Sequence, residues 1–84
     1  MAYGVRILEQ VTAALIQMDE ASHELFVMAM LDLASDPHSR GHAISAEGSR
    51  TTRTLAMGAL GLIVYIVDDA ESAVEVADVI SLDG

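Results

Sequence analysis

The sequence predicts an α+β fold in which a helical hairpin packs on one face of a small, mainly antiparallel β-sheet. Apolar residues recur at helical spacing in the first half of the chain, and an Asp36–Pro37 pair ends that pattern. The second half holds runs of β-branched residues on both sides of a polar turn, which favours strands. The 84 residues suit one small domain, which we expect to span residues 1–84.

The chain opens with a predicted strand followed by two predicted helices. Residues 3–7 (YGVRI) alternate in character, which places Tyr3, Val5 and Ile7 on one side of a strand. From Glu9 to Met18 the period becomes helical, with apolar residues at i, i+3, i+4 and i+7: Val11, Ala14, Leu15 and Met18. These features predict a strand that leads directly into an amphipathic helix.

The second helix is predicted from a polar break and an apolar run. Asp19, Glu20 and Ser22 can cap a helix start. Residues 25–33 are almost continuously apolar and rich in good helix formers, so we expect this helix to be buried on more than one face. It should end at Asp36, because the residue before a proline is pushed out of the helical region.

Residues 38–53 form a polar segment with no apolar period, which predicts a loop. The segment holds three of the four arginines and two histidines but a single acid, so it is a basic island in an acidic chain. We treat its basic residues as the candidate phosphate contacts: Arg50, Arg53, Arg40 and His42. The alternative is that these charges are solvated and pair with the surplus of acids.

Two strands are predicted to follow. Residues 54–67 are uncharged and apolar, with β-branched and aromatic residues toward the end, as in a strand buried on both faces. After a turn at residues 68–72, one side of a last strand would carry Val74, Val76, Ile80 and Leu82, and Asp78 would share that side. Residues 72–75 also fit a capping box, so a helix over residues 72–82 stays open as an alternative.

Composition restricts the classes of function. The formal charge is −9, from 13 acids against four arginines and no lysine, the opposite of the usual balance in a nucleic-acid binder. The absence of cysteine excludes disulfides and thiolate metal sites, and no cofactor or metal motif is present. We see no signal peptide, and the longest uncharged stretch falls short of the roughly 20 residues that span a bilayer, so we expect a cytoplasmic protein.

The high apolar content points to a partner. At 52% hydrophobic residues, a domain this small should leave apolar surface exposed for a protein partner or for self-association. His38 and His42 have no carboxylate partner that the sequence places, so solvent exposure is favoured over a metal site. Tyr65 is interpreted as a packing residue rather than a catalytic acid.

In the order and spacing of its elements, the chain resembles the RelE/ParE toxin superfamily. The strings that carry the resemblance are residues 3–7 (YGVRI), 31–37 (LDLASDP), 48–58 (GSRTTRTLAMG), 62–69 (LIVYIVDD) and 74–80 (VEVADVI). The resemblance implies a cytoplasmic toxin of a toxin–antitoxin system, with a cognate antitoxin as its partner. Active relatives are ribosome-dependent endoribonucleases that repress translation, work without a metal, and use basic side chains on the sheet.

Carried over residue by residue, the basic positions of the family are mostly missing. The basic strand position after the loop matches Arg53, with Arg50 just before it, but the central-strand arginine falls on Gly61 or Leu62. The basic residues that follow the last strand are absent, since the chain ends in SLDG. We therefore predict a toxin-like protein with weak or no ribonuclease activity. The alternatives are a non-catalytic protein-interaction or dimerisation domain that keeps the fold only, and an unrelated helical module if residues 72–82 are helical.

Overall fold

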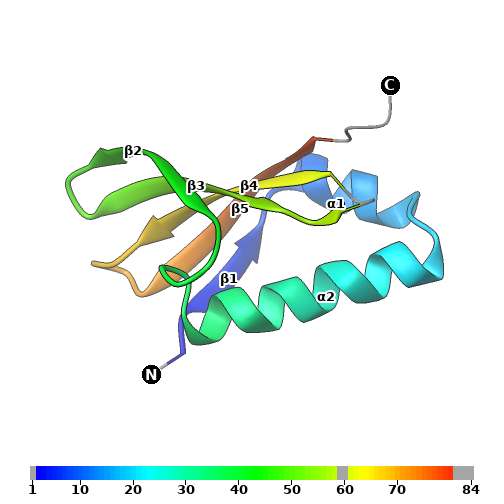
Figure 1. Cartoon of the computed structure of the whole chain (residues 1–84), viewed down its shortest axis with the longest axis horizontal. Helices are drawn as coiled ribbons and strands as arrows, with labels where there is room; N and C mark the ends of the chain where they lie inside the picture. The colour runs from blue at the N-terminus through cyan, green and yellow to red at the C-terminus, as the bar shows by residue number, and fades with distance from the viewer. Residues whose placement is uncertain (1, 59–60, 81–84) are drawn as a thin grey trace.

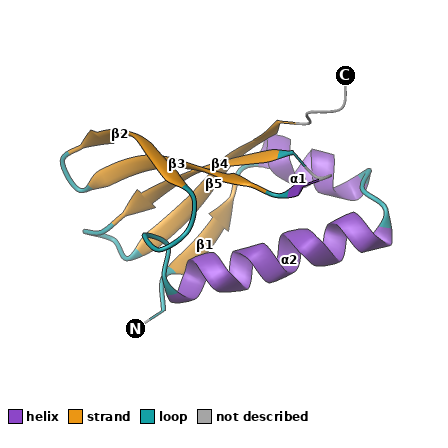
Figure 2. Ribbon diagram, viewed as in Figure 1, coloured by secondary structure: helices purple, strands orange, loops and turns teal. Residues whose placement is uncertain are grey.

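The computed structural model describes residues 2–58 and 61–80, and in it two helices cover one face of a five-stranded sheet (Figures 1 and 2). The elements in chain order are β1 (Gly4–Ile7), α1 (Glu9–Ile16), α2 (Glu20–Ser35), β2 (His42–Glu47), β3 (Arg50–Ala56), β4 (Leu62–Asp68) and β5 (Ala73–Ile80). The strand order across the sheet is β1-β5-β4-β3-β2. The predicted α+β class is confirmed.

The sheet is mainly antiparallel, as predicted. β2, β3, β4 and β5 pair antiparallel in succession, and β1 pairs parallel with β5 at one edge. Residues 73–80 are a strand, and Val74 and Val76 in it pair with Val67 and Tyr65 of β4. The alternative helix over residues 72–82 is therefore wrong for the described residues, although Leu82 lies outside them.

The core lies between the helices and the covered face of the sheet. Its fully buried side chains include Val11 of α1, then Phe26 and Leu33 of α2, together with Ile63, Tyr65, Val67, Val74 and Val76 of the sheet. Burying one such side chain stabilises a fold by about 1.5–3 kcal/mol. This apolar contact holds the helical layer on the sheet.

β4 is buried on one face only, so the prediction of a strand buried on both faces was wrong. Ile63, Tyr65 and Val67 are buried under the helices, whereas Val64 and Ile66 between them are half-buried. Both helices lie on the same side, which leaves the other side of the sheet uncovered (Figure 2). We call this side the open face.

A β-bulge in β5 moves Asp78 to the open face. Val64 pairs with Asp78 and Tyr65 pairs with Val76, so Ala77 is the extra residue. Beyond the bulge Val79 lies on the same side as Val76, and Asp78 is exposed. The strict alternation used in the prediction could not place this shift, so the predicted side of Asp78 was wrong.

The segment predicted as a loop contains a β-hairpin. β2 and β3 are joined at Gly48 and Ser49, and Gly48 takes a positive φ of 61° that suits glycine at a tight turn. Every residue of β2 is exposed. An edge strand with no buried side leaves no apolar period, so no pattern in residues 38–53 indicated this hairpin.

The second helix has the predicted start and stop but less burial than expected. The Asp19 carboxylate accepts a hydrogen bond from the Ser22 N–H at 2.8 Å, and the helix ends at Ser35, just before Asp36–Pro37. One side of α2 remains exposed, with Leu25, Val27, Met28 and Leu31 among its apolar residues. The prediction that this helix is buried on more than one face was therefore wrong. No helix among residues 2–58 and 61–80 is long and apolar enough to cross a membrane.

Candidate functional site

The four predicted phosphate contacts gather around the β2–β3 hairpin but do not form one cluster. Arg50 and Arg53 are three residues apart on β3, so their side chains lie on opposite faces of the sheet. Arg50 lies on the open face, and Arg53 lies on the face toward the helices. Arg40 lies in the loop between α2 and β2, and His42 begins β2. The arrangement therefore assigns each residue a different environment.

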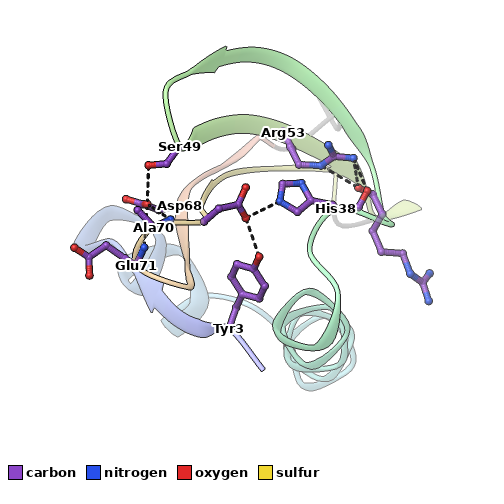
Figure 3. A network of polar contacts seen from close by, with 9 residues as sticks. Tyr3, His38, Ser49, Arg53, Asp68, Ala70 and Glu71 are labelled. Atoms are coloured by element: carbon purple, nitrogen blue, oxygen red, sulfur yellow. Dashed lines mark hydrogen bonds and ion pairs between the residues drawn. The ribbon is translucent and has the colours of Figure 1, made fainter. Parts of the chain in front are cut away.

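Arg53 holds the loop between α2 and β2 through hydrogen bonds to the backbone carbonyls of that loop. Its Nη2 donates to the carbonyl oxygens of His38 at 3.1 Å, Arg40 at 3.0 Å and Gly41 at 3.4 Å, and its Nε donates to the Arg40 oxygen at 3.3 Å. The buried Tyr65 hydroxyl donates to the same Arg40 oxygen at 2.9 Å. Figure 3 shows the Arg53 side chain directed at this loop. The guanidinium is thus occupied by backbone acceptors.

Gly41 allows the loop to approach the sheet. It has a positive φ of 66°, and a Cβ built there would lie 2.1 Å from the Thr54 carbonyl oxygen and 2.9 Å from the Tyr65 hydroxyl. No side chain fits at these distances. Glycine at this position lets the loop carbonyls come within reach of Arg53 and Tyr65.

Arg50 lies on the open face among acids. Its Nη1 lies 3.4 Å from an Asp68 oxygen and its Nη2 lies 3.8 Å from a Glu75 oxygen. Glu47 is its cross-strand neighbour on β2. A depression of about 290 Å³ lies beside it, lined by Ser45, Glu47, Arg50, Thr52 and Ile66. An incoming phosphate would meet one cation surrounded by carboxylates.

The remaining two candidates are exposed. Arg40 carries an ion pair to Asp32 of α2 at 3.4 Å, and both side chains are more than half exposed. His42 pairs with Thr54 at the start of β2 and is exposed. Neither residue is brought next to Arg50 by a contact in the described residues.

The central strand supplies no charge where the resemblance expects an arginine. Leu62 begins β4 between Ala56 of β3 and Ile80 of β5. Gly61 precedes it, is buried and has a positive φ of 100°. At this end of the sheet the three paired residues Ala56, Leu62 and Ile80 therefore carry no charge.

Sequence reasoning missed a polar cluster at the turn between β4 and β5. One oxygen of Asp69 accepts the Tyr3 hydroxyl hydrogen bond at 2.7 Å and lies 2.8 Å from Nε2 of His38. The rings of Tyr3 and His38 meet edge to face with centroids 6.5 Å apart. In Figure 3 dashed lines join the neighbouring side chains of Tyr3 and His38 to the same carboxylate. The cluster joins the N-terminal segment, the α2–β2 loop and the turn.

The cluster changes two pKa values. The hydrogen bond from His38, and then the one from Tyr3, lowers the pKa of the Asp69 carboxyl below its usual range. The hydrogen bond to Asp69 raises the pKa of the Tyr3 hydroxyl, because Tyr3 donates this bond through the proton that it would lose on ionisation. The three residues are far apart in the sequence, so no spacing signal could have revealed them.

The neighbouring Asp68 holds the turn itself. Its Oδ1 accepts hydrogen bonds from the Ser49 hydroxyl at 3.2 Å and from the N–H groups of Ala70 at 3.1 Å and Glu71 at 3.2 Å. A carboxylate that accepts hydrogen bonds from the backbone N–H groups two and three residues later is common in tight turns. Among the residues that the structure describes, no group of three or more His, Asp or Glu side chains could hold a metal ion.

Comparison with known proteins gives matches in structure alone. No protein-family model and no curated protein sequence matches the chain. The RelE–RelB complex of the archaeon Pyrococcus horikoshii OT3 contains a chain that matches with a TM-score of 0.90 at 20% identity, covering 99% of this chain and 98% of that one. This chain has the RelE fold.

A second RelE structure agrees. An arginine-to-alanine variant of the E. coli toxin RelE in the free state matches with a TM-score of 0.73 at 18% identity, covering 99% of this chain and 86% of that one. The fold that the resemblance implied is thereby confirmed. The RelE fold extends over nearly the whole chain rather than over one motif.

Proposed function

We propose that the chain is a RelE-like toxin component of a toxin–antitoxin system that represses translation and cleaves messenger RNA weakly or not at all. The observation that carries the proposal is the RelE fold, which matches almost end to end a chain solved in complex with RelB. The cognate partner would be an antitoxin protein, the site of action the ribosome with its messenger RNA, and the location the cytoplasm.

The contacts of the arginines support weak cleavage. A ribonuclease without a metal must hold a polyanion and stabilise negative charge that builds on phosphate, and fixed cations do this. Arg53 is engaged by three backbone carbonyls, and Arg50 lies between Asp68 and Glu75. A net charge of −9 also opposes the approach to ribosomal RNA.

The cleavage part of the proposal is tested by expressing the chain in bacteria and mapping messenger RNA ends. We expect no new codon-positioned ends. Arg50→Ala is the variant to compare, because its side chain is half exposed and its loss should leave the fold intact. Arg53→Ala is unsuitable for this purpose, since it removes loop contacts as well as a charge. Growth arrest with codon-positioned cuts that Arg50→Ala abolishes would show the proposal wrong.

The partner part is tested through the gene neighbourhood. If an adjacent open reading frame encodes a small DNA-binding protein, its product should co-purify with this chain and relieve any growth arrest. A product that neither co-purifies nor relieves arrest would count against an antitoxin partner.

A second candidate is a non-catalytic protein-interaction or dimerisation domain that keeps the fold only. The exposed apolar residues of α2 and the acidic charge favour it. Pelleting with bacterial ribosomes at low salt separates the two: a toxin that represses translation should pellet with ribosomes, whereas an interaction domain should stay in the supernatant.

A further inference from the structure

The open face of the sheet carries a second arginine besides Arg50. Arg6 of β1 is exposed and pairs with Glu75 of β5. The preceding pair, Val5 with Val74, lies on the face toward the helices, where Val74 is buried. Because successive side chains of a strand alternate between its two faces, Arg6 and Glu75 lie on the open face. The strand order β1-β5-β4-β3 then places Glu75 between Arg6 and Arg50.

Glu75 is directed toward Arg50 across β4. One carboxylate oxygen of Glu75 lies 3.8 Å from Nη2 of Arg50, and the Glu75 side chain is 28% exposed against 50% for Arg50. Glu75 pairs with Ile66 of β4, an apolar residue that is half-buried. A charge that is partly shielded from water acts on its neighbours more strongly than a fully solvated one. The Glu75 carboxylate therefore offsets the positive charge of Arg50 on the face that a ligand would approach.

The contacts of the fold do not account for an acid at position 75. Asp68, the other carboxylate beside Arg50, holds the turn between β4 and β5 through three hydrogen bonds. Within residues 2–58 and 61–80, Arg50 is the one ion-pair partner of Glu75, at the long distance of 3.8 Å. Glutamate is also depleted in β-strands. The charge of Glu75 therefore points to a role in binding rather than in folding.

We propose that Arg6 and Arg50 form a latent anion site on the open face and that Glu75 keeps this site closed to the phosphates of RNA. A phosphate that approaches either arginine also approaches the Glu75 carboxylate, so attraction and repulsion oppose each other. Removal of that one negative charge leaves two guanidinium groups on the same face, and guanidinium groups bind phosphate through paired hydrogen bonds. The inference rests on the proposed function in the choice of RNA as the anion, and it adds the residue that limits binding there.

The spacing of the two arginines favours an extended polyanion over a single phosphate ion. Arg6 lies on β1 and Arg50 on β3, with β5 and β4 between them. A chain of linked phosphates contacts both cations at once, and the second contact is then intramolecular. Inorganic phosphate is too small to gain from the second arginine. The effect of Glu75 should therefore be larger for RNA than for the free ion.

The test is an NMR titration of the full chain with a short single-stranded RNA, which measures weak binding and shows where it occurs. The salt concentration is kept at about 0.05 M so that exposed charges are only partly screened. We expect Glu75→Gln to bind the RNA at least about fivefold tighter than the parent chain, since a repulsive charge a few ångströms from the phosphate is removed. The amide shifts should move on β1 and β3.

Glu24→Gln is the matched control for net charge. It removes one negative charge from an exposed side chain of α2, on the other side of the sheet, and should change the affinity for RNA by less than about twofold. The double variant Glu75→Gln with Arg50→Ala should bind RNA no better than the parent chain, because the arginine that Glu75 neutralises is gone. Circular dichroism of each variant checks that the fold is kept.

Three outcomes would overturn the inference. They are an affinity of Glu75→Gln equal to that of the parent chain, equal gains from Glu75→Gln and Glu24→Gln, and a gain that persists when Arg50 is also replaced. A gain for inorganic phosphate as large as that for RNA would likewise contradict a site built from two arginines. The titration involves no ribosome, antitoxin or growth measurement, so a failure here is distinguishable from a failure of the proposed function.

Discussion

Arg53 should be a stabilising residue of the fold, and Arg53→Ala tests this most sharply. The substitution removes four donor contacts, of 3.0 to 3.4 Å, to the carbonyls of His38, Arg40 and Gly41. Hydrogen bonds from a charged donor contribute about 1.5–3 kcal/mol each when well made. These contacts are long and mostly exposed, so we expect the whole set to contribute roughly 2 kcal/mol.

The assay is urea unfolding followed by circular dichroism. Arg53→Ala should lower the free energy of unfolding by roughly 2 kcal/mol with an unchanged dependence on urea. Arg40→Ala is the matched control, because it removes an arginine from the same loop whose side chain makes one exposed ion pair, worth about 0–1 kcal/mol. If the two variants lose the same stability, the role assigned to Arg53 in holding the loop is wrong.

Two further substitutions test the same region. Gly41→Ala should destabilise the fold by several kcal/mol in urea unfolding, because its Cβ would lie 2.1 Å from the Thr54 oxygen, and a variant as stable as the parent chain would contradict that close approach. The pKa of Asp69 is lowered in the folded state, so its contribution to folding stability is present above the unfolded-state pKa of about 3.9. That contribution is lost as the pH falls through the folded-state pKa. Asp69→Asn should therefore reduce stability at neutral pH. The urea midpoints of the variant and the parent chain should converge as the pH falls from 7 into the acid range. A difference between the two midpoints that stays constant with pH would refute this.

Much of the fold was accessible from the sequence where burial imposes a period. α2 could be placed because Asp19 caps it and Pro37 follows its end, and β4 because β-branched and aromatic residues gather at residues 63–67. β2 escaped notice because all its side chains are exposed. The side of Asp78 was misjudged because a bulge of one residue reverses the alternation of the strand.

The candidate site was less accessible, for a physical reason. The sequence named Arg53 and Arg50 as cations but could not show what they contact. The partners of Arg53 are backbone carbonyls, which no side-chain pattern encodes. The acids around Arg50 come from β4 and β5, strands whose register becomes visible only in the folded chain.

We propose that this chain, which has the RelE fold, cleaves messenger RNA weakly or not at all because it lacks the cations that cleavage needs. The most direct measurement is cleavage of a defined messenger RNA on purified bacterial ribosomes, beside a lysine-rich RelE toxin at the same concentration. Losing one well-placed charge-stabilising donor costs about 10²–10³ in rate, so we predict cleavage at least about 10²-fold slower than in that toxin. Cleavage within about tenfold of that toxin, lost in Arg50→Ala, would contradict the account and make Arg50 an active-site residue.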